Sequence, residues 1–573
     1  MQFNGQEFTI KIWSEKDGKL GRFVCIDTET TMVPFYMTPE LVTFQAYAGG
    51  EYVYYVPKAK IKSFLDFNSS SFFIAQNMPF DADVLSKFLG SSEYVYNMYD
   101  NNRVRDTGVL YRLLHLASVG FVPFKYNLAL LTKKFLGVEL VKDEVRENFG
   151  QFLNVPVDQI PDEYLEYGAK DVIATYQIYF RLIPEIQRHD KMKTLLSHDI
   201  QVKGDLALLH IHKNGVGFNL SERDKWLISI DEEMQKHRDI LASWGWCRGK
   251  KGIKDDYENI LTTLGIASLL SRSEKSGDLS SKAEDLLPFT KYQFVESYLA
   301  YQSLEKASSF VRDITSTRIH PRYNLLVNTG RTSCSKPNFQ QLPKLGGIRE
   351  MFVAKPGHTF IITDYSAIEL ATLAQVCYSK YGYSDMMDRI NGGEDLHKYY
   401  ASVMHGCKTS EVTKQWRSEA KAANFGFPGG LGVETFIEFS RGYGLDLTTS
   451  EAQEMKDVWF ASWSEMKDYM RNEVGEVFTE TGRKRGQTTY CAEKNTPFQG
   501  LAADGAKLAL YNLDKQGFKV VGFVHDEIIC EVPRESAQSL MEDQERIMID
   551  SMRSVVPDVL VGVESAVSDF YTK

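Results

Sequence analysis

Acidic residues at the ends of apolar runs are the residues of this sequence best placed to do chemistry. In FIITDYSAIEL the apolar run 360–363 predicts a buried strand that ends at Asp364. In VVGFVHDEIICEV the runs 520–524 and 528–532 predict a hairpin with Asp526 at its tip. Taken alone, an aspartate at a strand end is more often a turn residue or a helix N-cap. Two such aspartates brought together can hold two divalent ions for in-line phosphoryl transfer.

A second set of carboxylates lies in the N-terminal third of the chain. Asp27 and Glu29 follow the strand-like run FVCI, and their i, i+2 spacing puts both side chains on one face of a strand. Asp81 and Asp171 follow at wide separation, with Tyr167 one helical turn before Asp171. Each acid alone is equally well explained as a surface residue. Gathered by a fold, the four carboxylates would suit a two-metal site that cleaves phosphodiesters.

Cations occur in two patterns that suit phosphate groups. In RSEAKAANFG, Arg417, Lys421 and Phe425 stand at i, i+4 and i+8, so one helical face presents two cations and an aromatic ring. Residues 306–349 hold eight Lys or Arg and one acid, although the net charge of the chain is −10. A basic stripe in an acidic chain is typical of a nucleic-acid surface, and a solvated charged face is the alternative.

Composition limits the class of protein. At 573 residues we expect two to four domains, and 43% apolar residues is typical of a globular chain. The sequence contains no apolar run long enough to cross a membrane and no signal or transit pattern at its start, so we expect a cytoplasmic protein. Seven scattered cysteines without a CxxC pair argue against disulfides and a zinc site.

Helical periodicity predicts the elements of the middle of the chain. We expect helices from Ser197 to a stop at Asn214-Gly215, over 225–242 and over 291–314. The polar stretch 271–287 is expected to be a loop that leads into a helix. Asp106, before VLYRLLHL, is either a helix N-cap or a neighbour of the carboxylate site.

The first 190 residues resemble the DEDDy 3′→5′ exonucleases in three motifs: DxE at Asp27, NxxFD ending at Asp81, and YxxxD from Tyr167 to Asp171. The resemblance implies that Asp27, Glu29, Asp81 and Asp171 hold two Mg²⁺ or Mn²⁺ ions while Tyr167 orients the attacking water. It also implies a ribonuclease H-like α/β domain with a mixed sheet.

The rest of the chain resembles the family A DNA polymerases, the relatives of DNA polymerase I. NTGRTSCSKPNFQQLP is similar to the signature TGRxSSxxPNxQN(I/L)P, while DYSAIEL, RSEAKAANFG and HDE are similar to motifs A, B and C. By this resemblance, Asp364 and Asp526 hold two metal ions, and Arg417 and Lys421 bind the incoming triphosphate. Lys421 is also the implied general acid for the pyrophosphate.

The resemblance implies further substrate contacts. Phe425 would pack near the sugar, Glu369 would lie beneath it and exclude ribonucleotides, and His525 would touch the primer end. The remaining expected contacts to the substrates are Glu527, Asn424, Arg331, Asn338, Gln341, Asn495 and Gln499.

Three departures from the family pattern affect the expected grip on DNA. Gly429 and Gly430 stand where the family has Tyr-Gly, and Pro428 must end the helix early. Ala371 and Cys491 stand where the family commonly has arginine.

Together these patterns predict a multidomain protein of α/β and α+β class. We expect an exonuclease domain over 1–190 and a right-hand polymerase over 191–573. The expected subdomains are a thumb near 195–345, a palm near 346–375 and 480–573, and fingers near 376–479.

The predicted function is DNA-templated DNA synthesis with proofreading. We expect a compact replicative enzyme of the bacteriophage type, without the 5′ nuclease domain. We expect this enzyme to be a monomer in the cytoplasm, which is the host cytoplasm if the protein is viral. Primer-template DNA, dNTPs and two ions per active site are the implied ligands. Helicase-primase, a single-strand binding protein and a processivity factor are the implied partners. Two alternatives remain: an exonuclease with an inactive DNA-binding polymerase module, and a noncatalytic primer-template clamp.

Overall fold

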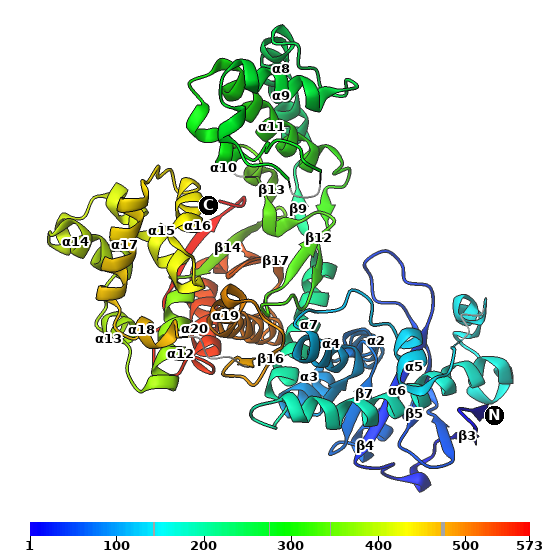
Figure 1. The fold of residues 1–573 in the computed structure, drawn as a ribbon. Coiled ribbons are helices and arrows are strands. Elements are labelled where there is room, and N and C mark those ends of the chain that lie inside the picture. Colours follow the sequence, from blue (N-terminus) through cyan, green and yellow to red (C-terminus); the bar gives the residue numbers. More distant parts are fainter. Residues whose placement is uncertain (141–143, 274–275, 344, 472–475, 573) are drawn as a thin grey trace.

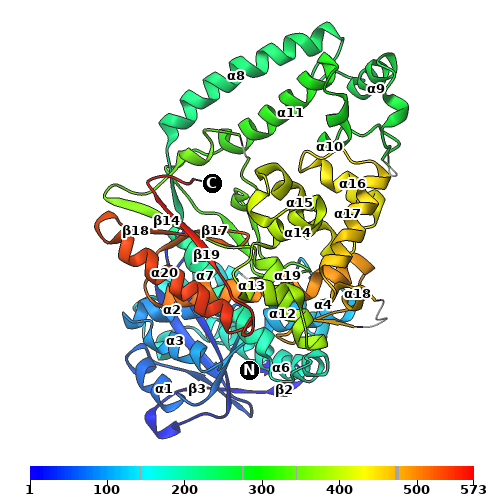
Figure 2. The ribbon, with the colours of Figure 1, turned by 90° about the vertical axis from the view of Figure 1, so that its left-hand side faces the viewer.

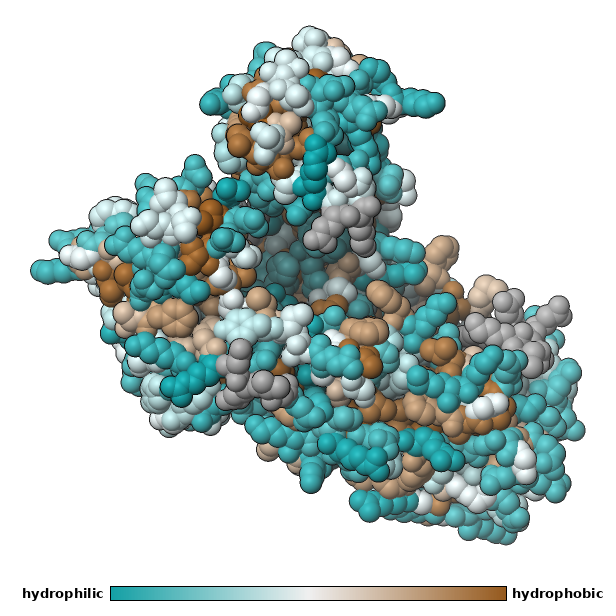
Figure 3. Space-filling view, viewed as in Figure 1, coloured by the Kyte–Doolittle hydropathy of each residue, from teal (hydrophilic) through white to brown (hydrophobic). Residues whose placement is uncertain are grey.

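The computed structural model describes residues 1–140, 144–273, 276–343, 345–471 and 476–572. An N-terminal lobe, a helical arm and a lobe of shorter helices surround a sheet in the middle of the molecule (Figure 1). The surface is hollowed where the three parts meet (Figure 3). No helix within the described ranges is long and apolar enough to cross a membrane. All seven cysteines are free.

The N-terminal lobe is built on a six-stranded sheet with the order β3-β6-β5-β4-β7-β8. Its strands are β3 (Thr9–Ile12), β4 (Phe23–Thr30), β5 (Leu41–Tyr47), β6 (Tyr52–Tyr55), β7 (Phe72–Ala75) and β8 (Val104–Asp106). Strand β4 is antiparallel to β5 and parallel to β7, and β7 is parallel to β8. The expected mixed sheet is therefore present.

Helices cover this sheet and set the direction of its loops. They are α1 (Ile61–Phe67), α2 (Met78–Leu89), α3 (Glu93–Asp100), α4 (Thr107–Val119), α5 (Leu128–Leu136) and α6 (Asp162–His189). The long helix α6 packs along β4, β5 and β7. Asp106 caps α4 by accepting the Val109 N–H at 3.0 Å, and its other oxygen accepts the Met78 N–H at 2.7 Å. Asp106 is thus an N-cap, and it also lies within electrostatic reach of Asp81.

The middle of the molecule is a four-stranded antiparallel sheet with the order β17-β18-β14-β19. Its strands are β14 (His358–Tyr365), β17 (Val520–Val524), β18 (Glu527–Pro533) and β19 (Val563–Ser568). The expected hairpin is present as β17 and β18. Strand β14 extends beyond the expected 360–363 because it pairs with β18 on one side and β19 on the other. Helices α12 (Ile368–Tyr381), α19 (Tyr490–Lys515) and α20 (Ala537–Arg553) pack around it.

The arm consists of two long helices, α8 (Leu220–Ser243) and α11 (Gln293–Arg312), which pack along each other. Its base is a small sheet of β9 (Val216–Phe218), β10 (Arg318–Ile319) and β13 (Phe352–Val353). The tip carries α9 (Ile253–Thr263) and α10 (Ala283–Leu286). Helix α10 lies beside α16 (Val433–Arg441) of the lobe of shorter helices, which faces the arm and is called the opposite lobe (Figure 2). The arm therefore reaches across the hollow.

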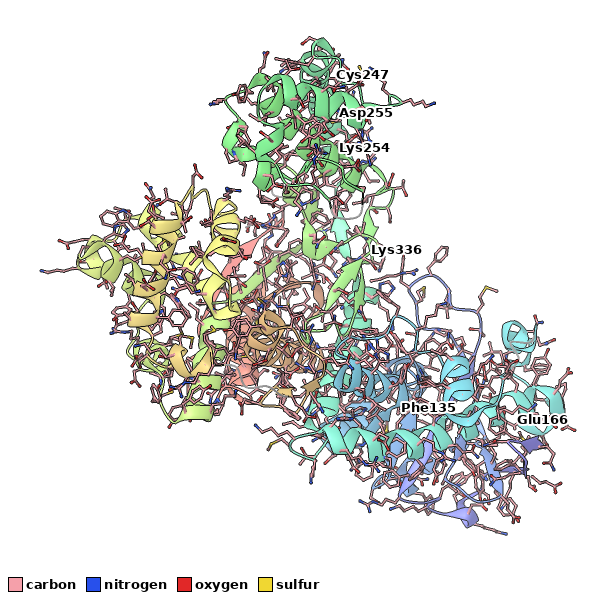
Figure 4. All side chains as sticks on the ribbon, viewed as in Figure 1. Phe135, Glu166, Cys247, Lys254, Asp255 and Lys336 are labelled. Atoms are coloured by element: carbon pink, nitrogen blue, oxygen red, sulfur yellow. The ribbon has the colours of Figure 1, made fainter. Side chains whose placement is uncertain are left out.

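The opposite lobe is a bundle of short helices. These are α13 (Asp385–Asn391), α14 (Leu396–His405), α15 (Lys414–Gly426), α16 (Val433–Arg441), α17 (Thr449–Ser462) and α18 (Met466–Tyr469). Two tryptophans of this lobe, Trp459 and Trp463, are fully buried. Two hairpins complete the chain: β11 (Arg322–Asn324) with β12 (Ser333–Ser335), and β15 (Val477–Phe478) with β16 (Lys484–Arg485). Exposed Lys336 follows β12 between the arm and the N-terminal lobe (Figure 4).

Helix α7 (Leu196–Asn214) joins the N-terminal lobe to the rest, and it ends at Gly215 as expected. Its Asp199 pairs with Arg105 of β8 at 2.8 Å. One turn from its end, His210 Nδ1 lies 2.7 Å from Asp514 of α19, and its Nε2 lies 3.7 Å from Asp83 of α2. The two parts of the molecule are thus tied by charged side chains on a shared helix.

Candidate active sites

Three carboxylates of the N-terminal lobe meet at one point. Asp27 and Glu29 lie on the same face of β4, and Asp171 lies on α6, which crosses that face. One oxygen from each of the three lies within 4.8 Å of the others, and all three residues are half-buried. Asp27 also accepts a hydrogen bond from the Gln45 amide at 2.7 Å. Tyr167 lies one turn before Asp171 on α6 and packs against Phe149.

The fourth expected carboxylate is held differently. Asp81, in the first turn of α2, is 2% exposed. Its Oδ1 accepts hydrogen bonds from the Thr28 backbone N–H at 2.9 Å and from the Thr28 hydroxyl at 2.6 Å. Burial, and then the negative charge of Asp27, raise the pKa of Asp81 well above its usual value. The structure therefore gathers three of the four acids, and the fourth lies beside them within electrostatic reach of Asp27, bonded to Thr28 of β4.

This donor set fits a divalent cation with a preference for oxygen. Carboxylate oxygens are the ligands that Mg²⁺ and Mn²⁺ take in proteins. Three negative charges so close to one another are unfavourable unless a cation compensates them. The expectation of a metal site is therefore consistent with Asp27, Glu29 and Asp171, within the part of the chain that the structure describes.

The second site is at the end of the middle sheet. The register of β14 and β18 places Asp364 directly opposite Glu527, which is the residue after Asp526. The turn between β17 and β18 contains His525 with a φ of 61°, in the left-handed region. The two aspartates expected to hold metal ions thus come from adjacent strand ends. Buried Glu527 accepts a hydrogen bond from the Tyr571 hydroxyl at 2.7 Å.

Arg331 and Glu369 face each other near this site. Arg331 follows the loop after β11, and its guanidinium forms an ion pair with the carboxylate of Glu369 in the first turn of α12. Burial lowers the pKa of Arg331, and the charge of Asp526 opposes this shift. The pair therefore lies within electrostatic reach of the strand-end acids. Sequence reasoning assigned both residues to substrates and missed their contact.

The cationic helix face is present on α15. Arg417 pairs with Asp395 at 2.8 Å, and Lys421 and Phe425 follow at one-turn intervals, both half-buried. The ring of Phe425 lies 5.5 Å from that of His397. The helix ends at Gly426 and continues as a short 3₁₀ turn through Pro428. The early end expected from the proline is confirmed.

Asn424 differs from the expectation. It is 1% exposed, its Oδ1 accepts the Trp459 indole N–H at 3.0 Å, and its Nδ2 lies 3.0 Å from His397 Nδ1. Burial lowers the pKa of His397 to about 4, so the neutral ring can accept this hydrogen bond. The amide of Asn424 is enclosed between α14, α15 and α17, and the substrate contact expected at this residue stays a prediction.

The start of α19 lies against Gly429 and Gly430, at the end of the 3₁₀ turn that follows the cationic helix. Asn495 Nδ2 donates to Cys491 O at 2.9 Å, and Gln499 donates to Asn495 Oδ1 at 3.2 Å. Gly430 has a φ of +80°, and a Cβ built on it would lie 2.6 Å from the ring of Tyr490. Tyr490 was not predicted as part of the site. No spacing rule in the sequence connects it to Gly430.

The basic loop between β11 and β14 has mixed exposure. Gln341 is exposed, Asn338 is half-buried, and Gln340 is buried with its amide donating to the Thr332 hydroxyl at 2.9 Å. Among the cations expected to form a stripe, Arg312, Arg318 and Arg331 are in ion pairs with Asp231, Glu531 and Glu369. Lys344 lies outside the described residues.

A buried charge network under this loop was also missed. Arg483 and Asp504 pair at 2.6 Å, and their side chains are 1% and 0% exposed. Lys507 donates to the carbonyl of Gly330 at 2.7 Å, and burial lowers its pKa to about 7. The network supports the backbone next to Arg331. Charged residues at these positions resemble surface residues in the sequence, so only the packing reveals them.

Comparison with known proteins shows what each part of the chain is similar to. A sequence model described as "3'-5' exonuclease" matches residues 2–187, and one described as "DNA polymerase family A" matches residues 254–572. DNA polymerase I of Aquifex aeolicus is 27% identical over 78% of this chain and 82% of its own length. Thermostable DNA polymerase I of Thermus aquaticus is 26% identical over 70% of this chain and 51% of its own length.

The chain thus spans about half the length of the Thermus relative and 59% of that from Borreliella burgdorferi. A solved structure described as "POL domain of Pol1 from M. smegmatis complex with DNA primer-template and dNTP" has a TM-score of 0.75, 19% identity and 97% coverage of both chains. The relatives named here are bacterial, and the bacteriophage origin stays a prediction. Because the polymerase model matches more than half of the chain, the chain belongs to DNA polymerase family A.

Proposed function

We propose that this chain extends DNA primers on a template and removes 3′-terminal nucleotides at a second site. The observation that carries the proposal is the β14–β18 register, which brings Asp364 and Asp526 to adjacent strand ends. We assign residues 1–190 to the exonuclease and 191–573 to the polymerase, with the arm as thumb, the middle sheet as palm and the helical lobe as fingers.

At the polymerase site, the chain's own residues position the reactants. Asp364 and Asp526 supply carboxylates for divalent ions, Mg²⁺ in this proposal, and such ions would stabilise the charge that develops during phosphoryl transfer. Arg417 and Lys421 bind the triphosphate from one face of α15, and Lys421 gives a proton to the pyrophosphate. Phe425 packs against the sugar. His525, Glu527, Asn495, Gln499, Asn338 and Gln341 contact the nucleic acid.

At the exonuclease site, Asp27, Glu29 and Asp171 supply the carboxylates, with Asp81 beside them. Tyr167 orients the water that attacks the terminal phosphodiester. Nearly all of this chemistry is positioning and electrostatic stabilisation, because the described sites contain no serine or cysteine placed as a nucleophile. Primer-template DNA and dNTPs are the proposed substrates in the cytoplasm, and the replisome partners named above are proposed as well.

Primer extension with Mg²⁺ and dNTPs, run beside digestion of a single-stranded 3′ end, tests the proposal. Asp364→Ala should abolish extension and leave digestion intact, because each site collects its own carboxylates. Asp27→Ala combined with Glu29→Ala should do the reverse. If the wild-type chain digests DNA and never extends a primer, the inactive-module alternative is correct. Loss of both activities in Asp364→Ala, with an unchanged circular dichroism spectrum, would contradict two separate sites.

A further inference from the structure

A cavity of about 260 Å³ lies at the opposite end of β4 from the carboxylates. It is enclosed by the first residues of β4 and β7, the C-terminal half of α6 and the linker that leads to α7. Phe23 and Phe72, paired in the sheet, form one wall, and Tyr179 of α6 forms another. Nothing in the proposed polymerase or exonuclease reaction uses this cavity.

The lining of the cavity is positively charged. Arg22, Arg105 and Lys193 line it, and none of its lining residues in the described ranges is acidic. Arg105 is 7% exposed and pairs with Asp199 at 2.8 Å. Arg22 and Lys193 are exposed, and neither is in an ion pair with a carboxylate among the described residues. In a chain with a net charge of −10, such a concave, acid-free surface favours an anion.

Aromatic rings accompany these cations. The rings of Phe23 and Phe72 stack at 5.3 Å, and the Arg22 guanidinium lies 5.4 Å from the first and 5.9 Å from the second. Phe180, also in the lining, is 41% exposed. Guanidinium groups bind phosphates, and exposed aromatic and guanidinium planes stack on nucleobases. The cavity is also several times larger than a single bound water or small ion requires.

We propose that this cavity binds a mononucleotide, with its phosphate on Arg22 and Lys193 and its base against the aromatic wall. The same chemistry could be presented by a nucleoside monophosphate, a nucleoside triphosphate or inorganic phosphate, and the experiment below separates these sources.

The position of the cavity connects it to the carboxylate site. Phe23 and Asp27 lie on the same face of β4, separated by roughly 13 Å of strand. Tyr179 and Asp171 lie on α6, separated by roughly 12 Å of helix. The linker residue Lys193 and the Arg105–Asp199 pair also join the cavity to α7. A ligand in the cavity therefore contacts the two elements that carry Asp27 and Asp171.

Acetylation of lysines, followed by mass spectrometry, reports on this cavity alone. Lys193 and Lys191 are both exposed, but only Lys193 lines the cavity, so Lys191 is the matched internal control. The full chain is labelled in EDTA, with and without dAMP, dATP or inorganic phosphate. At a ligand concentration about ten times the Kd, acetylation of Lys193 should slow about tenfold while that of Lys191 is unchanged. Arg22→Gln should remove the protection.

Each outcome decides the proposal. Protection of Lys193 by dAMP supports it, and equal protection by dATP extends it to triphosphates. If inorganic phosphate protects Lys193 as well as dAMP does, the cavity binds anions in general, and the proposal of a mononucleotide site is overturned. Equal effects on Lys191 and Lys193, or no effect on either, would overturn it altogether. The labelling needs no catalysis, so its result is independent of whether the proposed polymerase and exonuclease activities are correct.

Discussion

Arg331 and Glu369 form an ion pair that connects the basic loop before the middle sheet to the first turn of α12. Their side chains are 39% and 22% exposed, so the pair borders the solvent-filled side of the site. Glu369 lies five residues beyond Asp364 in the sequence. The ion pair holds the carboxylate of Glu369 in a defined position next to the strand-end acids. A side chain that selects between nucleotide sugars by steric contact requires such a fixed position.

We therefore predict that Glu369 limits ribonucleotide incorporation. Glu369→Ala removes the side chain that would collide with a 2′-hydroxyl, and loss of ~1.4 kcal/mol of discrimination would raise the relative use of rNTP about tenfold. Glu369→Gln keeps the volume and should retain most of the discrimination. Single-nucleotide incorporation kinetics with matched rNTP and dNTP give the ratio. An unchanged ratio in Glu369→Ala would remove this residue from sugar selection.

The second prediction concerns Gly430. Alanine there must adopt a φ of +80°, which costs ~1 to 2 kcal/mol, and its Cβ would lie 2.6 Å from the Tyr490 ring. Gly430→Ala should lower the thermal unfolding midpoint and weaken dNTP binding, because the end of α15 and the start of α19 must separate. Gly432→Ala is the control, since a Cβ there meets nothing within 4 Å. Equal behaviour of the two variants would show that the Gly430–Tyr490 contact is unimportant.

The third prediction concerns the buried pair beneath Arg331. Asp504→Asn leaves the Arg483 guanidinium without its charge partner in a site where neither side chain is more than 1% exposed. We expect a loss of ~3 to 5 kcal/mol in the free energy of unfolding, measured by urea denaturation. Asp543→Asn breaks an exposed pair with Arg546 and should cost at most ~1 kcal/mol. A similar small cost at both positions would contradict a structural role for the network.

The fourth prediction is a pH dependence of the junction between the two parts of the chain. Burial alone would lower the pKa of His210, but its hydrogen bond to Asp514 and the negative charges of Asp514 and Asp83 outweigh burial and raise the pKa to about 9. A raised folded-state pKa stabilises the fold fully below pH ~6.5, the unfolded value, and this stabilisation is lost as the pH rises through about 9. The full effect is at most about 3 kcal/mol.

Thermal unfolding at pH 6.5 to 9.5 measures this effect. The wild type should lose stability across the range, and His210→Gln should be less stable at pH 6.5 and lose less as the pH rises. His358→Gln serves as the control, because this histidine lies on β14 and its ring contacts the carbonyl of Pro356. Parallel pH profiles for the wild type and His210→Gln would mean that His210 is not charged in the folded chain.

Much of the fold could be predicted from local patterns. Continuous apolar runs predicted the strands that carry Asp27 and Asp364, and Asn214-Gly215 and Pro428 predicted the ends of α7 and α15. These predictions succeed because strand formation, helix ends and the i, i+2 and i, i+4 spacings depend on residues that are neighbours in the chain. The carboxylates Asp27, Glu29 and Asp171 were found for the same reason, since each stands at a recognisable place on its own element.

Only the tertiary structure decided how residues far apart in the chain share the space around the sites. It turned Asp81 toward Thr28, enclosed Asn424 beside Trp459, and paired Arg331 with Glu369. It also placed Arg105 and Lys193 in one cavity and buried Arg483 with Asp504. The orientation of a side chain between two packed elements depends on the residues that it contacts there. Those residues are brought together by burial of apolar surface, and this driving force is not directional. The sequence by itself therefore determined which groups are available and on which element each one lies, and packing determined which of them meet.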